Sequence, residues 1–143
     1  MDTKPKQTLA LGLHHSERLL VEPRHTVPQV EPSWPGFRDM PPVLATAMMV
    51  AFIEETCIRA LRPFLSPAQR TVGIRVDVSH VAPTPVGMHF TAEVVLTGIA
   101  GKSLQFDVRC RDERGLIGEG THQRAVIDMA RFSQRLQEKA AAA

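Results

Sequence analysis

The sequence predicts an α+β fold in which a curved antiparallel sheet wraps around one long central helix. A strand, a proline-rich loop and a long helix come first, and four strands joined by short turns follow. Strands joined by short turns pair in antiparallel fashion. The first half of the helix is apolar on nearly every side, which is typical of a helix in the middle of a domain. The 143 residues suit a single domain, residues 1–143.

The chain begins with a strand within residues 9–22 and an irregular loop over residues 23–42. Six prolines in this loop remove backbone donors and turn the residues before them away from helical conformation. A loop of this length in a small domain is typical of lids and binding segments. Its apolar side chains Trp34, Phe37 and Met40 indicate that it packs against another surface.

The long helix is predicted over residues 43–61, between two prolines. Thr46 is the one polar residue in its apolar first half. Glu54 shares an arc of the helix with apolar neighbours, where an unpaired carboxylate is unfavourable.

Residues 71–81, 88–97, 103–111 and 116–128 alternate in polarity and are predicted as strands. In the first of these, the alternation places Val72, Ile74, Val76 and Val78 on the face toward the helix, and His80 ends that face. An open sheet edge and a half-covered helix favour association into a dimer.

The two ends of the chain have patterns of their own. Met129, Phe132 and Leu136 have the i, i+3, i+7 spacing of a short amphipathic helix. We expect residues 1–7 and 140–143 to be flexible.

Composition and charge exclude several functions. The net charge of +2 is too small to favour nucleic acid, and no apolar run reaches the roughly 18 residues of a membrane span. Residues 1–7 are polar and no signal-peptide core follows them. Cys57 and Cys110 lack metal-ligand spacing, which favours free thiols in a reducing, cytoplasmic compartment. The six histidines also lack such spacing, so no metal is expected.

Thr46, Glu54 and His80 are the three polar residues that the predicted fold brings to this apolar region. A hydroxyl, a carboxylate and an imidazole can form a hydrolytic site, because one attacks or positions, one transfers protons and one orients its neighbour. Each also has a structural explanation, since a helical Thr bonds back to a carbonyl and a lone His can be a core residue.

Six fragments together resemble one known family. They are Pro42-Val-Leu-Ala-Thr46, Ile53-Glu-Glu-Thr-Cys-Ile-Arg-Ala60, Thr71-Val-Gly73, Ser79-His80, Ala82-Pro-Thr-Pro85 and Gly118-Glu-Gly-Thr-His-Gln-Arg124. In their combined spacing, residues 25–128 resemble the fluoroacetyl-CoA thioesterase family, a branch of the hot-dog-fold thioesterases. The fold that this resemblance implies agrees with the one predicted from periodicity.

The resemblance also implies roles for five residues. Thr46 matches the catalytic hydroxyl, Glu54 the helix carboxylate and His80 the catalytic imidazole. Gly73 matches a glycine whose backbone lies close to the thioester, and Arg124 matches an arginine near the site. In the family, hydrolysis proceeds either through an acyl-enzyme or through a directly activated water, and the sequence leaves both routes open.

The resemblance further implies an acyl-CoA substrate and no cofactor beyond the CoA of that substrate. It also implies a homodimer with two sites at the interface, or a tetramer formed by two such dimers. By the same resemblance, we expect the loop 23–42 to form a lid over the substrate and its residues Phe37 and Met40 to contact that substrate. Fluoroacetyl-specific members carry Phe where this chain has Met40, which favours a different small or medium acyl group.

Three other functions remain open from the sequence. One is a dimer that binds acyl-CoA or another small ligand without turnover. Another is a hydratase or dehydratase of the same fold, but the Asp/His pair that such an enzyme needs is not found. The third is a purely structural partner domain, which would bind no CoA thioester.

Overall fold

The computed structural model describes residues 7–142. Most of the segment 1–7, expected to be flexible, and Ala143 therefore lie outside the described residues. The strands are β1 (His14–Leu20), β2 (Gln69–Val78), β3 (His89–Ala100), β4 (Ser103–Asp112) and β5 (Gly115–Asp128). The helices are η1 (Pro23–His25), α1 (Val27–Val30), α2 (Pro35–Arg38), α3 (Thr46–Leu61), η2 (Arg62–Phe64) and α4 (Met129–Ala142).

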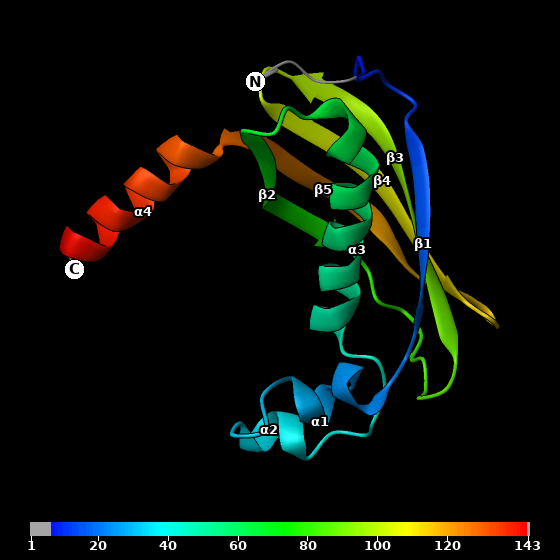
Figure 1. Ribbon diagram of the computed structural model, residues 1–143. Helices are drawn as coiled ribbons and strands as arrows, with labels where there is room; N and C mark the ends of the chain where they lie inside the picture. The colour runs from blue at the N-terminus through cyan, green and yellow to red at the C-terminus, as the bar shows by residue number, and fades with distance from the viewer. Residues whose placement is uncertain (1–6, 143) are drawn as a thin grey trace.

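The five strands form one antiparallel sheet in the order β1-β3-β4-β5-β2. The sheet curls, and α3 lies along its concave side (Figure 1). The predicted architecture of a curved antiparallel sheet around one long helix is therefore confirmed. Strands β1 and β2 are the two edges, and β2 is the edge that follows α3 in the chain.

The core lies between α3 and the concave face of β3 and β4. The alternating residues of both strands predicted to share a face are all buried: Phe90, Ala92, Val94, Leu96, Leu104, Phe106, Val108 and Cys110. Phe52 of α3 packs edge-on against Phe90, with ring centroids 5.4 Å apart. Burial of these apolar side chains is the main contribution that fixes α3 against the sheet.

The predicted face of β2 is wrong at Val72 because the strand contains a β-bulge. The register with β5 shifts between Gly73 and Arg75. Before the bulge, Gly73 pairs with Arg124, and after it Val76 pairs with His122. Arg124 and His122 are both buried in the concave side, and directly paired residues share a face. The extra residue thus turns Gly73 toward α3 and Val72 away from it.

The loop 23–42 is more regular than predicted. Its prolines at positions 23, 28 and 35 occupy the first or second residue of η1, α1 and α2. At that position a proline loses no helical hydrogen bond, and its fixed φ suits the helix. The base of the loop is tied to the segment before α3, because the Val27 amide donates to the Val43 carbonyl and the Ala45 amide to the His25 carbonyl.

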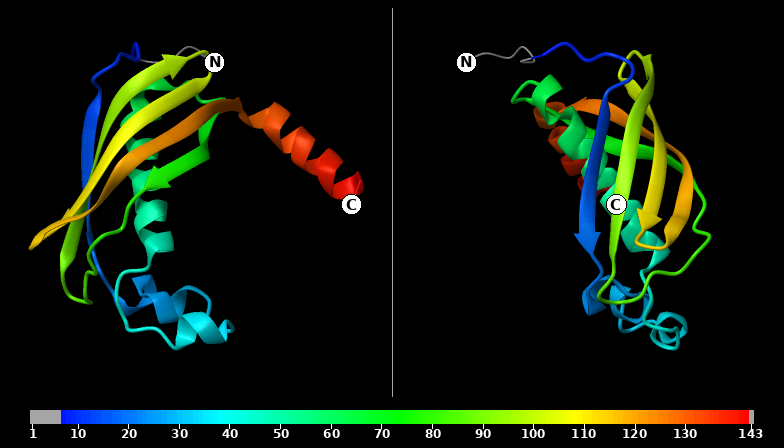
Figure 2. Two further views of the ribbon diagram at one scale, coloured as in Figure 1. Left: turned by 180° about the vertical axis from the view of Figure 1, so that it is seen from behind. Right: turned by 90° about the vertical axis from the view of Figure 1, so that its right-hand side faces the viewer.

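Helix α4 follows β5 directly and extends away from the sheet (Figure 2). The predicted C-terminal helix is present, but residues 140–142, expected to fray, belong to it. None of its side chains is fully buried, and Leu136 is 54% exposed. In residues 7–142, no helix is long and apolar enough to cross a membrane.

Candidate active site

Thr46 and His80 form the first part of the candidate site. Thr46 is the first residue of α3, and His80 lies two residues beyond the end of β2. The Thr46 Oγ1 and the His80 Nδ1 are 2.7 Å apart, which is a short hydrogen bond. The segment after β2 is held beside β5, because the Ser79 amide donates to the Glu119 carbonyl and the Val81 amide to the Ile117 carbonyl. The predicted contact of His80 with the helix is therefore present.

The surroundings of His80 favour a neutral imidazole. Burial lowers the pKa of His80 below its ordinary value of 6.5. The Nε2 atom is buried, and within the described part of the chain it has no hydrogen-bond partner. The nitrogen that can exchange a proton with a neighbouring side chain is therefore Nδ1, which faces the Thr46 hydroxyl.

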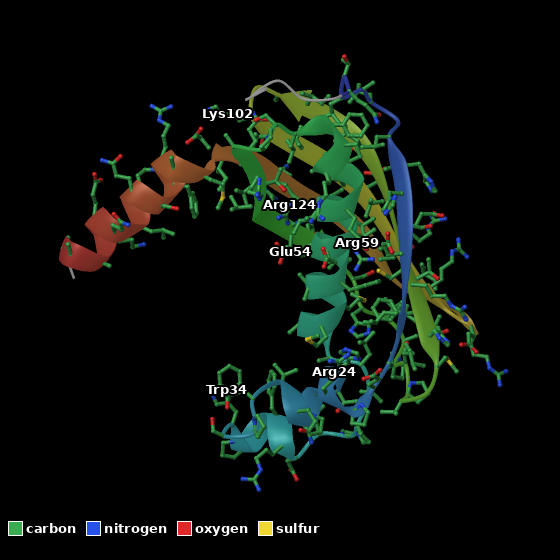
Figure 3. The ribbon with its side chains drawn as sticks, in the orientation of Figure 1. Arg24, Trp34, Glu54, Arg59, Lys102 and Arg124 are labelled. Atoms are coloured by element: carbon green, nitrogen blue, oxygen red, sulfur yellow. The ribbon has the colours of Figure 1, made fainter. Side chains whose placement is uncertain are left out.

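Glu54 and Arg124 form the second part. The Glu54 Oε1 and the Arg124 Nη1 are 2.9 Å apart. Figure 3 shows these two side chains pointing toward one another, Glu54 from α3 and Arg124 from the sheet. Arg124 is nearly fully buried, whereas the Glu54 side chain is 38% exposed. The carboxylate that the sequence places among apolar helical neighbours is therefore paired with the buried guanidinium of β5.

Arg124 is held on its other side by Thr71 of β2. Its Nε donates to the Thr71 hydroxyl and its Nη2 to the Thr71 carbonyl, both at 2.9 Å. These bonds fix the plane of the guanidinium, because its N–H groups project in a rigid fork. A buried arginine without such partners would strongly destabilise the fold.

The absence of a side chain at Gly73 lets the Glu54 carboxylate lie against β2. A Cβ atom at position 73 would overlap the Glu54 Oε1 and would come within 3.4 Å of the Arg124 Nη1. Only glycine leaves this space at the inner face of the strand. Gly73, Glu54 and Arg124, which the sequence predicted separately, thus form one cluster.

His122 belongs to the same cluster and was not predicted as a site residue. It is fully buried, with its Nδ1 2.8 Å from the Arg75 carbonyl oxygen and its Nε2 3.1 Å from the Arg124 Nη1. The signal in the sequence was its position two residues before Arg124, which puts both on one face of a strand. Thr71 was not predicted because its inward direction depends on the bulge in β2.

Within one chain the two clusters are separate. Thr46 and Glu54 are eight residues apart on α3, which corresponds to about 12 Å along the helix axis. The structure therefore joins Thr46 to His80, and Glu54 to Arg124 and Gly73, but it does not bring all three predicted catalytic side chains together in a single chain.

Phe37 and Met40 lie in the loop before α3. Trp34 and Phe37 pack edge to face with ring centroids 5.2 Å apart, and the Met40 side chain is 49% exposed. In residues 7–142, no hydrogen bond or aromatic contact joins Phe37 or Met40 to Thr46 or His80. The expected contact of these two residues with a substrate stays a prediction.

The cysteines have no properties of nucleophiles. Cys57 and Cys110 are free and buried, and burial raises the pKa of each thiol to about 12. A thiol with such a pKa is almost entirely protonated near neutral pH. For metals, no group of three His, Cys, Asp or Glu side chains in the described residues is arranged to hold an ion.

A long helix against a curled antiparallel sheet in this strand order is the hot-dog fold. A hypothetical protein of the thioesterase superfamily from Thermus thermophilus has the same fold, with a TM-score of 0.81 at 25% identity over 94% of this chain and 97% of that one. The fold places this chain in the class of hot-dog-fold proteins of the thioesterase superfamily.

Closer relatives specify the family. A model of fluoroacetyl-CoA-specific thioesterases matches residues 21–130. The fluoroacetyl-CoA thioesterase of Streptantibioticus cattleyicolor is 34% identical over 134 residues, which are 94% of this chain and 96% of that protein. A solved structure of a fluoroacetyl-CoA thioesterase has a TM-score of 0.91 at 34% identity, covering 93% of this chain and 98% of that one. This chain belongs to the fluoroacetyl-CoA-specific thioesterase family.

Proposed function

We propose that this protein hydrolyses the thioester of a small or medium acyl-CoA to a free acid and CoA, with Thr46, Glu54 and His80 as the catalytic group. The observation that carries the proposal is the 2.7 Å hydrogen bond between the Thr46 hydroxyl and His80 Nδ1. A neutral imidazole in that position can take the hydroxyl proton, which converts a weak nucleophile into a strong one. The family's relatives supply the substrate class.

One route to the products uses Thr46 as the nucleophile. Its Oγ attacks the thioester carbonyl carbon while its proton passes to His80 Nδ1. The C–S bond then breaks, the proton goes to the departing CoA sulfur, and water hydrolyses the acyl-Thr46 ester. Thr46 begins α3, where unpaired backbone N–H groups and the helix dipole favour the negative charge that develops on the carbonyl oxygen.

The other route uses water directly. Glu54 or His80 then removes a proton from a water that attacks the thioester, and Thr46 orients the carbonyl by a hydrogen bond. Rapid quenching followed by mass spectrometry separates the routes. Thr46 carries the mass of the acyl group in the first route and remains unmodified in the second.

The catalytic group is complete only in a dimer under this proposal. Strand β2 is an edge strand, and its Ile74 and Val76 are 52% and 45% exposed. Antiparallel pairing of β2 with β2 of a second copy puts the start of one strand beside the end of the other. Gly73 and Glu54 of one chain then lie near Thr46 and His80 of its partner, which removes the 12 Å separation within a chain.

The acyl group differs from that of the fluoroacetyl-specific relatives in this proposal. The lid residues 23–42 cover the substrate, and Met40 and Phe37 contact its acyl part. Met40 stands where those relatives carry Phe, and a flexible thioether adapts to larger groups than a rigid ring allows. Arg124 supports the site through its ion pair with Glu54.

Release of free thiol from a panel of acyl-CoA thioesters tests the function. The panel runs from acetyl and fluoroacetyl to phenylacetyl and longer chains. We expect turnover by the wild type and a loss of about 100-fold or more in Thr46→Ala and in His80→Ala. His14→Ala, on the opposite edge of the sheet, and Thr97→Ala serve as controls with wild-type rates.

Two outcomes of the panel would refute the proposal. Unchanged hydrolysis in both site variants would exclude Thr46 and His80 from the chemistry. Tight CoA binding by calorimetry without thiol release from any panel member would instead identify a non-catalytic acyl-CoA binding protein.

A further inference from the structure

The buried imidazole of His122 takes no part in the proposed reaction, yet it lies in the cluster that holds Glu54. His122 is a residue of β5 whose ring contacts the neighbouring β2 and has no exposed surface. Burial of a polar ring costs free energy unless its nitrogens have hydrogen-bond partners. Both do, and the two partners differ in chemistry.

The two contacts fix the protonation of the ring. The Arg75 carbonyl oxygen, 2.8 Å from Nδ1, can only accept a hydrogen bond, so Nδ1 carries the proton. The Arg124 Nη1, 3.1 Å from Nε2, can only donate, so Nε2 presents its lone pair. The ring is therefore the neutral Nδ1–H tautomer. Burial first, and the Arg124 charge as well, lower the pKa of His122, in agreement with that form.

The lone pair of His122 limits the directions open to Arg124. Its Nη1 carries two hydrogens, and two acceptors face it: His122 Nε2 and Glu54 Oε1. Since the guanidinium is planar, a hydrogen directed to His122 leaves the other directed to Glu54. Thr71 fixes the remaining side of the plane through Nε and Nη2.

We infer that His122 is a positioning residue of the proposed thioesterase reaction, which orients Glu54 by accepting a hydrogen bond from Arg124. The inference rests on the proposed function and adds a residue to it. His122 itself touches neither Thr46 nor His80 in the described contacts, so it acts through Arg124. The β-bulge is part of the arrangement, because it brings the Arg75 carbonyl and Gly73 to the cluster.

Two substitutions separate the roles of the two nitrogens. The Oε1 of a glutamine lies as many bonds from Cβ as Nε2 does, so His122→Gln keeps an acceptor for Arg124. The side-chain nitrogen of an asparagine matches Nδ1, so His122→Asn keeps the donor to Arg75 and loses the acceptor. We expect kcat to fall about 10- to 100-fold in His122→Asn, with KM nearly unchanged, and to stay within about threefold in His122→Gln.

A double-mutant cycle tests whether the effect passes through Glu54. In a Glu54→Ala background, His122→Asn should lower kcat by no more than about threefold, because the group it positions is absent. Equal losses in the Asn and Gln variants, wild-type kcat in the Asn variant, or additive losses in the cycle would each overturn the inference.

The inference also has a readout that requires neither variants nor turnover. Long-range proton–nitrogen NMR of the wild-type protein at pH 7 should show His122 as the Nδ1–H tautomer with an unprotonated Nε2. An Nε2–H tautomer or a doubly protonated ring would overturn it. A wild type that releases no thiol from any acyl-CoA would refute the proposed function, whereas a turnover that is insensitive to His122→Asn refutes only this inference.

Discussion

Gly73 leaves room for the Glu54 carboxylate beside the backbone of β2. Gly73→Ala should displace the Glu54 carboxylate, because the added methyl group overlaps Oε1. We expect kcat to fall about 10- to 100-fold, as for a small misplacement of a catalytic group. Steady-state thiol release measures the change. In a Glu54→Ala background the same substitution should have little further effect, and an equal loss in both backgrounds would contradict this explanation.

His80 determines the acid side of the pH profile. A base must be unprotonated to accept the Thr46 proton, so activity falls as the pH drops through the pKa of His80. Burial lowers that pKa below 6.5, so we expect kcat/KM to be flat from about pH 7 to 8 and to decline only in more acidic solution. A pH profile of kcat/KM checks this. A half-maximal value above pH 6.5 would be inconsistent with a buried, neutral His80.

Sequence reasoning at this scale succeeded where a polar residue stood out among apolar ones. Thr46, Glu54 and His80 were visible for that reason, and two of them do meet. Arg124 was predicted near the site only through the family resemblance, because its burial and its pairing with Glu54 cannot be deduced from strand periodicity. For His122, the sequence shows only that it lies on the same strand face as Arg124. Its tautomer depends on the Arg75 carbonyl, whose position is set by the fold.

At the scale of elements, the bulge in β2 is the feature with the largest consequence. The bulge lets Thr71 face inward, where its hydroxyl accepts a hydrogen bond from the buried Arg124. Thr71→Val removes that acceptor while Arg124 stays buried. We expect the free energy of unfolding to fall by about 2 kcal/mol.

Urea denaturation measures this loss. Val72→Ala, at a neighbouring position that faces away from α3, is the control for a simple loss of apolar surface and should cost about 1 kcal/mol. Wild-type stability in Thr71→Val would show that the hydrogen bond from Arg124 to the Thr71 hydroxyl does not stabilise the fold.

The lid offers a prediction about selectivity. Met40→Phe places a rigid ring where the chain has a flexible side chain, which should narrow the space for the acyl group. We expect the ratio of kcat/KM for acetyl-CoA to that for a hexanoyl thioester to rise by about 10-fold, a size typical of pocket discrimination by a few methylenes. Met129→Phe, the same substitution at an exposed position of α4, is the matched control. An unchanged ratio would remove Met40 from the acyl pocket.

The strands and the long helix could be predicted because their periodicity is strong, and β3 and β4 bury the predicted faces. The bulge in β2 could not be predicted, because residues 71–81 alternate in polarity without a break. The extra residue changes which side chains face α3 but leaves no mark in that alternation. The short helices of the loop could not be predicted from its prolines alone. A proline breaks a helix in its interior but fits the first turn without loss of a hydrogen bond, and the sequence does not distinguish the two positions.

For the whole molecule, both β2 and α3 leave apolar side chains uncovered in a single chain. Exposed Ile74 and Val76 lie on the edge strand β2, and exposed Ala47 and Ala51 lie on α3. Each part of the candidate site includes a residue of α3, with Thr46 at its N-terminal end and Glu54 near its middle. A second copy paired along β2 accounts for both the apolar exposure and the separation of Thr46 from Glu54.

Complementation between two impaired variants tests this central claim. Thr46→Ala and Glu54→Ala should each keep only a small residual rate of thiol release as homodimers, about 100-fold or more below that of the wild type. In a mixed dimer, one of the two sites combines the Glu54 of the first variant with the Thr46 of the second and is intact. Equal amounts of the two proteins, after subunit exchange, should recover about one quarter of the wild-type thiol release, because half of the dimers are mixed and each has one working site. A mixture that stays as inactive as the separate variants, while native mass spectrometry shows that mixed dimers have formed, would contradict a site shared between two chains.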